Sequence, residues 1–153
     1  MPCELGQIVN VINLYALAVD CRLWELFDQV VTPDVKADYA GSPGWSDLPS
    51  FERDFAAFHE PLQATEHVMA NHPVRVDEDG RGGAGLTYGQ QFRSIRTVPE
   101  GGGEVWQGAA WNDDRLVVGR MDGVSAIGSR GSDGAAVHLS ARQCWARRWS
   151  SLA

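Results

Sequence analysis

The stretch INLYALAVDCRLWELFDQVVTPDVKADY, residues 12–39, decides how this chain folds. Apolar residues recur at intervals of three and four from Ile8 to Val19, which predicts a helix over residues 4–21 with one apolar stripe. Asp20 lies beside the end of that stripe, where the helix dipole opposes a negative charge. We therefore expect Asp20 to have a partner elsewhere in the fold that compensates its charge.

A predicted strand over residues 65–76 carries the histidine that we expect to be this partner. Alternate residues of a strand share a face, so His67 lies with Asn71, while His72 points to the other side and cannot share a metal with His67. A carboxylate bonded to one imidazole nitrogen makes the other nitrogen a better general base. The opposing interpretation is a solvent-facing Asp20 and a histidine with a purely structural role.

The rest of the pattern predicts an α+β fold, with helices first and antiparallel hairpins afterwards. A second helix is expected at 22–31, a strand at 35–39, a loop at 40–49 and a third helix at 48–62, capped by Ser46 or Ser50. Further strands are expected at 85–97, 104–118, 124–127 and 136–139, with turns at 77–80, 99–103 and 121–123. A curved sheet of this kind wraps on the helices and encloses a pocket.

Length and composition narrow the class of protein. A chain of 153 residues that is 44% hydrophobic fits one globular domain. The net charge of −7, with Lys36 as the one lysine, argues against a nucleic-acid partner, because phosphate binding needs clustered basic residues. The sequence shows no apolar run of membrane-spanning length and no secretory signal pattern, and its three scattered cysteines fit reduced thiols. We therefore expect a cytoplasmic protein without a membrane partner.

Aromatic side chains are candidates for the lining of the pocket. Tyr15 and Tyr39 fit either a donor to a substrate carbonyl or a core position, since each has an apolar ring and a polar tip. Tyr39 is the better candidate because it ends a short strand that follows the helices. Trp24 fits the core or the pocket wall.

Polar residues within the predicted strands are the other candidates. Alternation turns one of Gln90 and Gln91 inward, where a buried amide needs partners. Asn112, followed by two aspartates, fits either the pocket or an exposed bulge, and the bulge is slightly favoured. The pair Gly82-Gly83 lacks the lysine and hydroxyl of a phosphate loop, so it is interpreted as a turn, and no zinc-ligand spacing or nucleophile elbow is present.

Four segments resemble the SnoaL-like branch of the NTF2-like superfamily, and within it the scytalone dehydratase type. They are residues 12–39, TEHVMANHPVRVDEDG, LTYGQQFRS and GAAWNDDRLV, and the resemblance covers about residues 5–123. The most specific matches are Tyr15 with Asp20, Pro33-Asp34 with Tyr39, and His67 with Asn71.

The resemblance implies a cone-shaped α+β fold, in which N-terminal helices pack on a curved, mostly antiparallel sheet that encloses a pocket. It implies a homodimer or homotrimer that needs no cofactor and no metal. It also implies Asp20 and His67 as a catalytic dyad and Tyr39 as the donor that polarises a carbonyl. We expect the substrate contacts to come from Tyr15, Trp24, Asn71, Gln91 and Asn112.

Two departures from the family pattern qualify this resemblance. The second histidine of scytalone dehydratase-like sites is missing from residues 86–95, which weakens a literal dehydratase assignment. After Asp122-Gly123 the chain continues Val-Ser-Ala-Ile where the family has Trp and later Arg. One choice of GC-rich codons for this stretch can be read in another frame as Trp-Arg-Leu-Gly-Asp-Arg. We therefore divide the chain into a SnoaL-like domain, 1–123, and an atypical tail, 124–153, with a frameshift as a hypothesis that resequencing the gene tests.

Three functions are compatible with these features. The first is a cofactor-independent dehydratase, isomerase or cyclase, in which His67, oriented by Asp20, removes a proton next to a carbonyl of a small hydrophobic oxygenated substrate. The alternative is a non-catalytic small-molecule-binding or oligomerisation module. The third is a hydrolytic enzyme that activates water at Asp20, which needs further carboxylates and amides around the water.

Overall fold

The fold was analysed in a computed structural model. It describes residues 5–39, 44–97, 103–118, 125–127, 130–131, 134–135 and 137–149. Side chains are described for residues 5–39, 44–87, 92–96, 103–110 and 112–117. The predicted turns at 99–103 and 121–123 lie almost wholly outside the described residues.

The helices come first, as predicted, but their boundaries differ. α1 (Leu5–Cys21) buries the apolar stripe that begins at Ile8. The single helix predicted at 22–31 is wrong: Arg22 has a left-handed backbone with φ of 59°, and the chain then forms η1 (Trp24–Leu26) and α2 (Phe27–Val30).

The third helix, α3 (Leu48–His59), is shorter than the predicted range of 48–62. Its N-cap is Asp47, whose Oδ1 accepts a hydrogen bond of 2.8 Å from the backbone N–H of Ser50. The prediction of a serine cap is therefore wrong, because the carboxylate one residue before the helix occupies that role.

One curved sheet contains seven strands of the described chain, in the order β1-β9-β5-β4-β2, with β3 beside β4 and β6 beside β5. The strands are β1 (Val35–Tyr39), β2 (Ala64–Val68), β3 (Val74–Val76), β4 (Gly82–Thr97), β5 (Gly103–Val118), β6 (Ser125–Ile127) and β9 (Val137–Trp149). The pairing is antiparallel except for β1 with β9, and β7 (Arg130–Gly131) and β8 (Gly134–Ala135) form a separate pair. The predicted α+β class with a mostly antiparallel sheet is confirmed.

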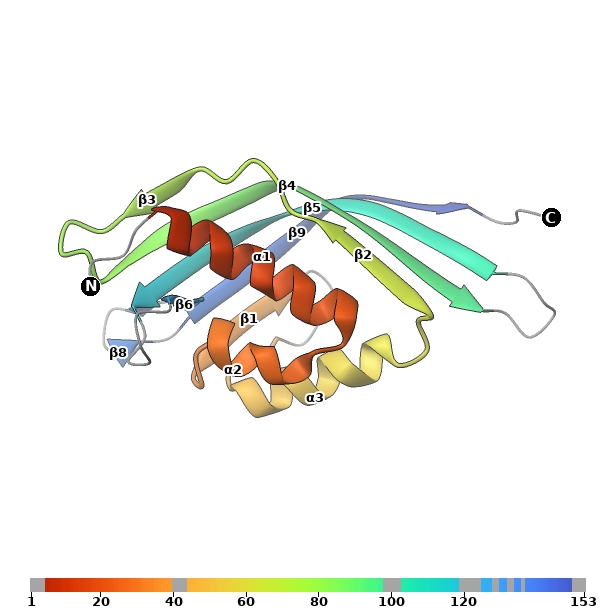
Figure 1. Ribbon diagram of the computed structural model, residues 1–153, viewed down its shortest axis with the longest axis horizontal. Helices are drawn as coiled ribbons and strands as arrows, with labels where there is room; N and C mark the ends of the chain where they lie inside the picture. Colours follow the sequence, from red (N-terminus) through yellow and green to blue (C-terminus); the bar gives the residue numbers. More distant parts are fainter. Residues whose placement is uncertain are drawn as a thin grey trace.

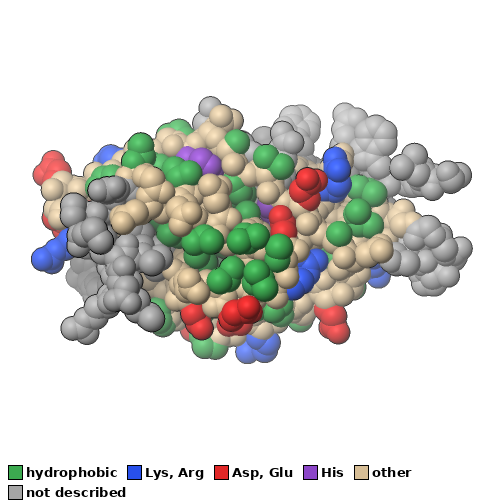
Figure 2. All heavy atoms as spheres, in the orientation of Figure 1, with side chains coloured by type: hydrophobic (Ala, Val, Ile, Leu, Met, Phe, Trp, Pro, Cys, Tyr) green, Lys and Arg blue, Asp and Glu red, His purple; other side chains and the backbone are tan. Residues whose placement is uncertain are grey.

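The helices lie together on one side of the sheet, with α1 across it and α2 and α3 next to α1 (Figure 1). Large side chains that are fully buried between these layers include Ile12, Phe27, Phe51 and Leu116. Each contributes about 1.5–3 kcal/mol by leaving water. On the helix-bearing surface, hydrophobic side chains gather near the middle, with charged side chains around them (Figure 2).

Two sequence features inside the sheet were misassigned. The strand predicted at 65–76 divides into β2 and β3, because Asn71 between them has a left-handed backbone with φ of 58°. Gly82 and Gly83 open β4 instead of forming a turn. A Cβ on Gly83 would meet the Arg75 carbonyl oxygen at 2.6 Å, so close strand packing explains this glycine.

The C-terminal region contributes a strand to the same sheet. The strand predicted at 136–139 is far too short, since β9 lies between β1 and β5. It pairs with β1 from Val137 to Ala141 and with β5 from Leu139 to Trp149. This part of the predicted tail therefore adds to the sheet. The frameshift remains a hypothesis. No helix of the described chain is both long enough and apolar enough to cross a membrane.

Candidate active site

The structure brings Asp20, at the end of α1, into direct contact with His67 in β2. The Asp20 Oδ1 atom lies 2.6 Å from the His67 Nδ1 atom, and Oδ2 accepts a 2.7 Å hydrogen bond from the His67 backbone N–H. The side chains are mostly buried, with 13% of His67 and 21% of Asp20 exposed. Two bonds from one carboxylate fix both the position and the plane of the imidazole.

The protonation of this pair follows from its hydrogen bonds. Burial would raise the pKa of Asp20, but the ring and the backbone of His67, together with the Thr65 hydroxyl, donate to the carboxylate and hold that pKa below its ordinary value. Because an ionised carboxylate only accepts, the His67 Nδ1 atom carries a proton. In the neutral ring, Nε2 then has the lone pair that a general base needs.

Arg22 ends α1 in an unusual way. The Leu23 N–H bonds the Ala18 carbonyl and the Arg22 N–H bonds the Val19 carbonyl, which is the Schellman arrangement with Arg22 at the left-handed position. Glycine is the usual residue there, and a side chain with a Cβ costs about 1–2 kcal/mol. The guanidinium turns back and donates to the Val19 carbonyl at 2.5 Å and to the Thr65 hydroxyl at 2.7 Å.

Tyr15 and Tyr39 meet through their hydroxyl groups, which lie 2.7 Å apart. Burial raises the pKa of each phenol above its ordinary value, and the charge of Asp114 acts in the same direction. Both hydroxyls are therefore protonated at neutral pH. In the bond between these two neutral hydroxyls, one donates its proton and the other accepts it.

Asn112 and Asp114 lie on the buried face of β5. Asn112 is 5% exposed and Asp114 is 3% exposed. The predicted bulge at these residues is wrong, because Asn112, Asp113 and Asp114 pair in unbroken register with β4, and only Asp113 faces solvent. The Asn112 Oδ1 atom is buried without a hydrogen-bond partner. Burial, helped by the charge of Asp113, raises the pKa of Asp114 to about 7.

His59, which the sequence interpretation overlooked, is a second buried imidazole, on α3. Its Nδ1 atom lies 2.7 Å from the Phe55 carbonyl, so Nδ1 is the donor, and the ring lies against Trp24 and Phe55. Burial lowers the pKa of His59 to about 4, and the charges of Arg22, His67 and Asp20 act on it too. His59 is therefore neutral at pH 7 and lies in the electrostatic range of the Asp20–His67 pair.

The other residues predicted to contact the substrate differ in their burial. Trp24 is partly buried and packs on the aromatic core at 5.7 Å from Phe27, measured between ring centroids. Asn71 is exposed, and its left-handed backbone is a sufficient reason for asparagine there, so the geometry gives its substrate role no support. Gln91 pairs with Val68 and Ala109 in the sheet, and its side chain lies outside the described residues.

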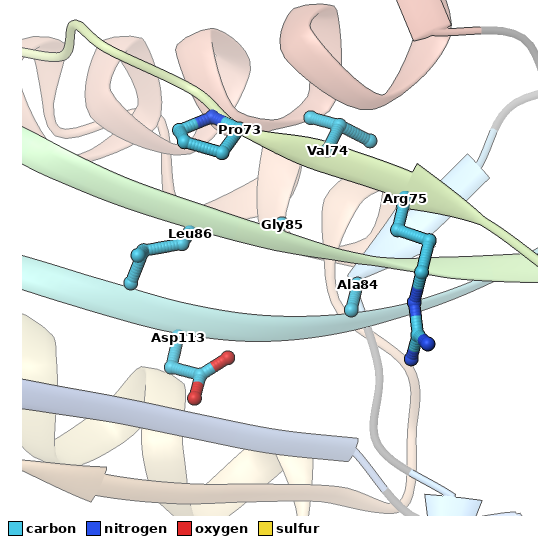
Figure 3. A pocket seen from close by; sticks show the side chains of 7 residues that line it. All are labelled: Pro73, Val74, Arg75, Ala84, Gly85, Leu86 and Asp113. Carbon is cyan, nitrogen blue, oxygen red and sulfur yellow. The ribbon is translucent and has the colours of Figure 1, made fainter.

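A shallow hollow of about 250 Å³ lies elsewhere, over β3, β4 and β5 (Figure 3). It is lined by Pro73, Val74, Arg75, Ala84, Gly85, Leu86 and Asp113. Ala84 and Leu86 alternate with Gly85, whose missing Cβ faces α1, so the hollow opens largely on the opposite face of the sheet. It contains none of the predicted site residues. Within the described residues, no group of three His, Cys, Asp or Glu side chains is arranged to hold a metal ion.

Helices packed on a curved antiparallel sheet, with a carboxylate and an imidazole paired at the end of the first helix, define an α+β cone of the NTF2-like class. The sequence profile of the SnoaL-like domain matches residues 4–130, so the chain belongs to the SnoaL-like domain family. No curated protein matches the sequence.

Solved structures with the same fold agree with this assignment. The Kfla4162 protein from Kribbella flavida has 18% identity and a TM-score of 0.67, with 93% of this chain and 91% of that one covered. A type 2 hexachlorocyclohexane dehydrochlorinase, LinA, has 14% identity and a TM-score of 0.71, with 96% and 89% covered. A predicted scytalone dehydratase from Novosphingobium aromaticivorans has 14% identity and a TM-score of 0.70, with 98% and 90% covered. Identities this low show a shared fold alone.

Proposed function

We propose that this protein is a cofactor-independent enzyme that removes a proton from carbon next to a carbonyl in a small hydrophobic oxygenated molecule. The observation that supports this most is the bidentate contact of Asp20 with the ring and the backbone of His67. A buried carboxylate that holds Nδ1 protonated leaves Nε2 as the base and stabilises the imidazolium formed when the proton is transferred.

The tyrosine pair supplies the second half of this chemistry. Proton removal next to a carbonyl places negative charge on oxygen, and Tyr39, in its bond with Tyr15, is the proposed donor to that oxygen. The Asn112 Oδ1 atom, buried and without a partner, would accept from a substrate hydroxyl. Departure of that hydroxyl as water, double-bond migration or ring closure can each follow the same first step.

The test uses the step that all these outcomes share. Incubation with cyclic hydroxyketones in deuterium oxide, followed by NMR, detects exchange of the hydrogen next to the carbonyl. A separate assay measures chloride release from hexachlorocyclohexane, because structurally similar proteins are named hexachlorocyclohexane dehydrochlorinases. We expect H67N and D20N to lower the rate about 100-fold or more, because the base or its orientation is lost.

E66Q is the matched control for D20N. Glu66 precedes His67 in β2, is largely exposed and has a loose ion pair with Arg93 at 3.6 Å, so removal of its charge leaves the rate within a few-fold. If the wild type turns over a substrate and H67N turns it over at a rate within a few-fold of the wild type, this mechanism is ruled out.

The unpaired Asn112 oxygen also favours a second candidate, a small-molecule-binding module without catalysis. A thermal-shift screen of the same ketones separates the two. Stabilisation by a ketone with no deuterium exchange in the wild type favours the binding module. We further propose a homodimer or homotrimer in the cytoplasm, which light scattering and cell fractionation test.

A further inference from the structure

We propose that His72 is a substrate-binding residue, which donates from its Nε2–H to a hydroxyl group that the Asn112 Oδ1 atom also binds. His72 lies on the face of the sheet that α1 covers, and its ring contacts Thr87, which is opposite Asn112 in the sheet. We call the Nε2 atom of His72 and the Oδ1 atom of Asn112 the hydroxyl site. This inference rests on the proposed function and narrows its substrate class to ketones that carry a free hydroxyl.

A change in the alternation of side chains turns His72 toward the interior. In an unbroken strand, residues separated by an odd number of positions point to opposite faces. Met69 and Val74 are five residues apart, and yet both pack on the hydrophobic core. The left-handed backbone of Asn71 lies between them and reverses the alternation, so His72 shares the inner face with Val74. The prediction that His72 points away from the face of His67 is therefore wrong.

Two buried polar residues of the neighbouring strands lie beside His72. Gly85 of β4 faces α1, because a Cβ on it would meet the Ile12 side chain at 3.5 Å, and Thr87 lies two residues further along the same face. Thr87 is fully buried and pairs with Asn112 of β5, whose Oδ1 atom has no partner. The register of β4 shifts directly after Thr87, and bulges of this kind re-aim side chains next to active sites. Irregularities in two adjacent strands therefore meet where these polar groups gather.

The proton positions follow from the hydrogen bond of Thr87. Its Oγ1 atom lies 2.9 Å from the His72 Nδ1 atom, and no other described residue bonds this hydroxyl. A buried hydroxyl proton needs an acceptor, so Thr87 donates to Nδ1. In the neutral ring the proton is then on Nε2. His67 has the opposite tautomer, with its proton on Nδ1 and its lone pair on Nε2.

The hydroxyl site matches the hydrogen bonding of an alcohol. The Nε2–H of His72 is a donor that has no acceptor among the described residues, whereas the Oδ1 atom of Asn112 is an acceptor that has no donor. A hydroxyl group both donates and accepts, so it can satisfy both atoms. A carbonyl or ether oxygen only accepts and leaves the Asn112 oxygen unpaired. His67 acts next to the carbonyl of the substrate, and the hydroxyl site recognises its alcohol.

A purely structural role of His72 leads to a different prediction. In that case the ring only satisfies the Thr87 hydroxyl, and its Nε2 atom faces solvent. H72N separates the two roles, because the amide oxygen can replace Nδ1 as the acceptor for Thr87 while the Nε2 donor is lost. H72Q is the opposite variant, since its amide nitrogen can replace the Nε2 donor. R75Q, which changes an exposed side chain of β3, is the control.

The experiment compares ketones that differ by one hydroxyl, 3-hydroxycyclohexanone with cyclohexanone and 4-hydroxy-1-tetralone with 1-tetralone. Two-bond ¹H–¹⁵N correlation spectra of the full-length protein, with H72N to assign the signal, should show the His72 proton on Nε2. A hydroxyketone should shift this signal. We expect the wild type and R75Q to bind one of the hydroxyketones about 10-fold more tightly than its parent ketone. This preference should fall below about threefold in H72N and N112L, and H72Q should recover part of it.

The failure of this inference is distinguishable from the failure of the proposed function. A hydroxyl preference that depends on His72, in a protein without deuterium exchange, supports the hydroxyl site while the catalytic proposal fails. A preference that survives in H72N overturns the hydroxyl site, even when H67N abolishes exchange. A proton on Nδ1 of His72, or a His72 signal that neither hydroxyketone shifts, overturns it as well.

Discussion

The two polar regions of this interior differ in how well their hydrogen bonds are satisfied. At the end of α1, the Asp20 carboxylate accepts from the ring and the backbone of His67. On β5, the Asn112 Oδ1 atom is buried without a partner, and near it Asp114 has a carboxyl whose pKa is raised to about 7.

This difference separates two functions within one site. The satisfied region is rigid and presents one imidazole nitrogen in a fixed state, which suits proton transfer. The unsatisfied region has a cost in stability that a bound ligand can remove by supplying the missing hydrogen bond. We infer that the first region performs the chemistry and that the second orients the substrate. Substitutions in the two regions should therefore change stability in opposite directions.

The largest loss of stability is expected from D20A. Removal of the carboxylate leaves the His67 backbone N–H and ring N–H, both largely buried, without their acceptor. We expect a loss of about 2–3 kcal/mol in the free energy of unfolding, measured by urea denaturation at pH 7.

D28A, in the exposed first turn of α2, is the matched control and should change stability by about 0.5 kcal/mol or less. A D20A variant as stable as the wild type would show that the satisfied region contributes nothing to stability. The proposed difference between the two polar regions would then be wrong.

The fold class was predictable because most elements have regular patterns. The apolar stripe of α1 and the alternation of β4 and β5 are local features that burial enforces. The break after Cys21 was not predictable, since it depends on a left-handed arginine whose cost is offset by contacts with β2. β9 was underestimated because its composition is weakly strand-like, whereas its pairing with β1 and β5 is decided by the sheet.

The site was predictable only in part. The resemblance pointed to Asp20 and His67, which the structure brings into contact. The sequence interpretation slightly favoured an exposed bulge that included Asp114. Asp114 is two residues from Asn112 and two from buried Leu116, and this alternation is the strand signal that places it on the buried face of β5. His59 was overlooked because its role depends on packing between α3 and Trp24, which no local pattern records.

A second effect on stability depends on pH and concerns Asp114. Its folded pKa of about 7 exceeds the ordinary value of 3.8, so the folded protein binds more protons than the unfolded chain between these values. Stability linked to Asp114 is therefore fully present below about pH 4 and is lost as pH rises through about 7. D114N, which cannot ionise, should match the wild type near pH 4 and exceed it by about 4 kcal/mol at pH 8, because each unit of the pKa shift corresponds to about 1.4 kcal/mol.

Urea denaturation of the wild type and D114N at both pH values checks this difference, in which contributions from other groups cancel. His59 is one such group, because its lowered pKa makes the protein lose stability as pH falls through about 4. D113N, on the exposed face of the same strand, should give a much smaller difference. A constant offset between D114N and the wild type at both pH values contradicts a buried carboxyl that titrates near 7.

The smallest effect should come from N112L, and its sign is the informative part. Leucine has the same number and branching of side-chain heavy atoms as asparagine and removes a buried oxygen that lacks a partner, so we expect a gain of about 1 kcal/mol in the free energy of unfolding. The same substitution should abolish the thermal shift caused by a hydroxyketone that stabilises the wild type, because the acceptor for its hydroxyl is gone. A stabilised variant that no longer responds to the ketone places substrate orientation on β5. A variant destabilised by more than about 1 kcal/mol would mean that Asn112 is needed for the fold itself, and the two polar regions would then have the same role.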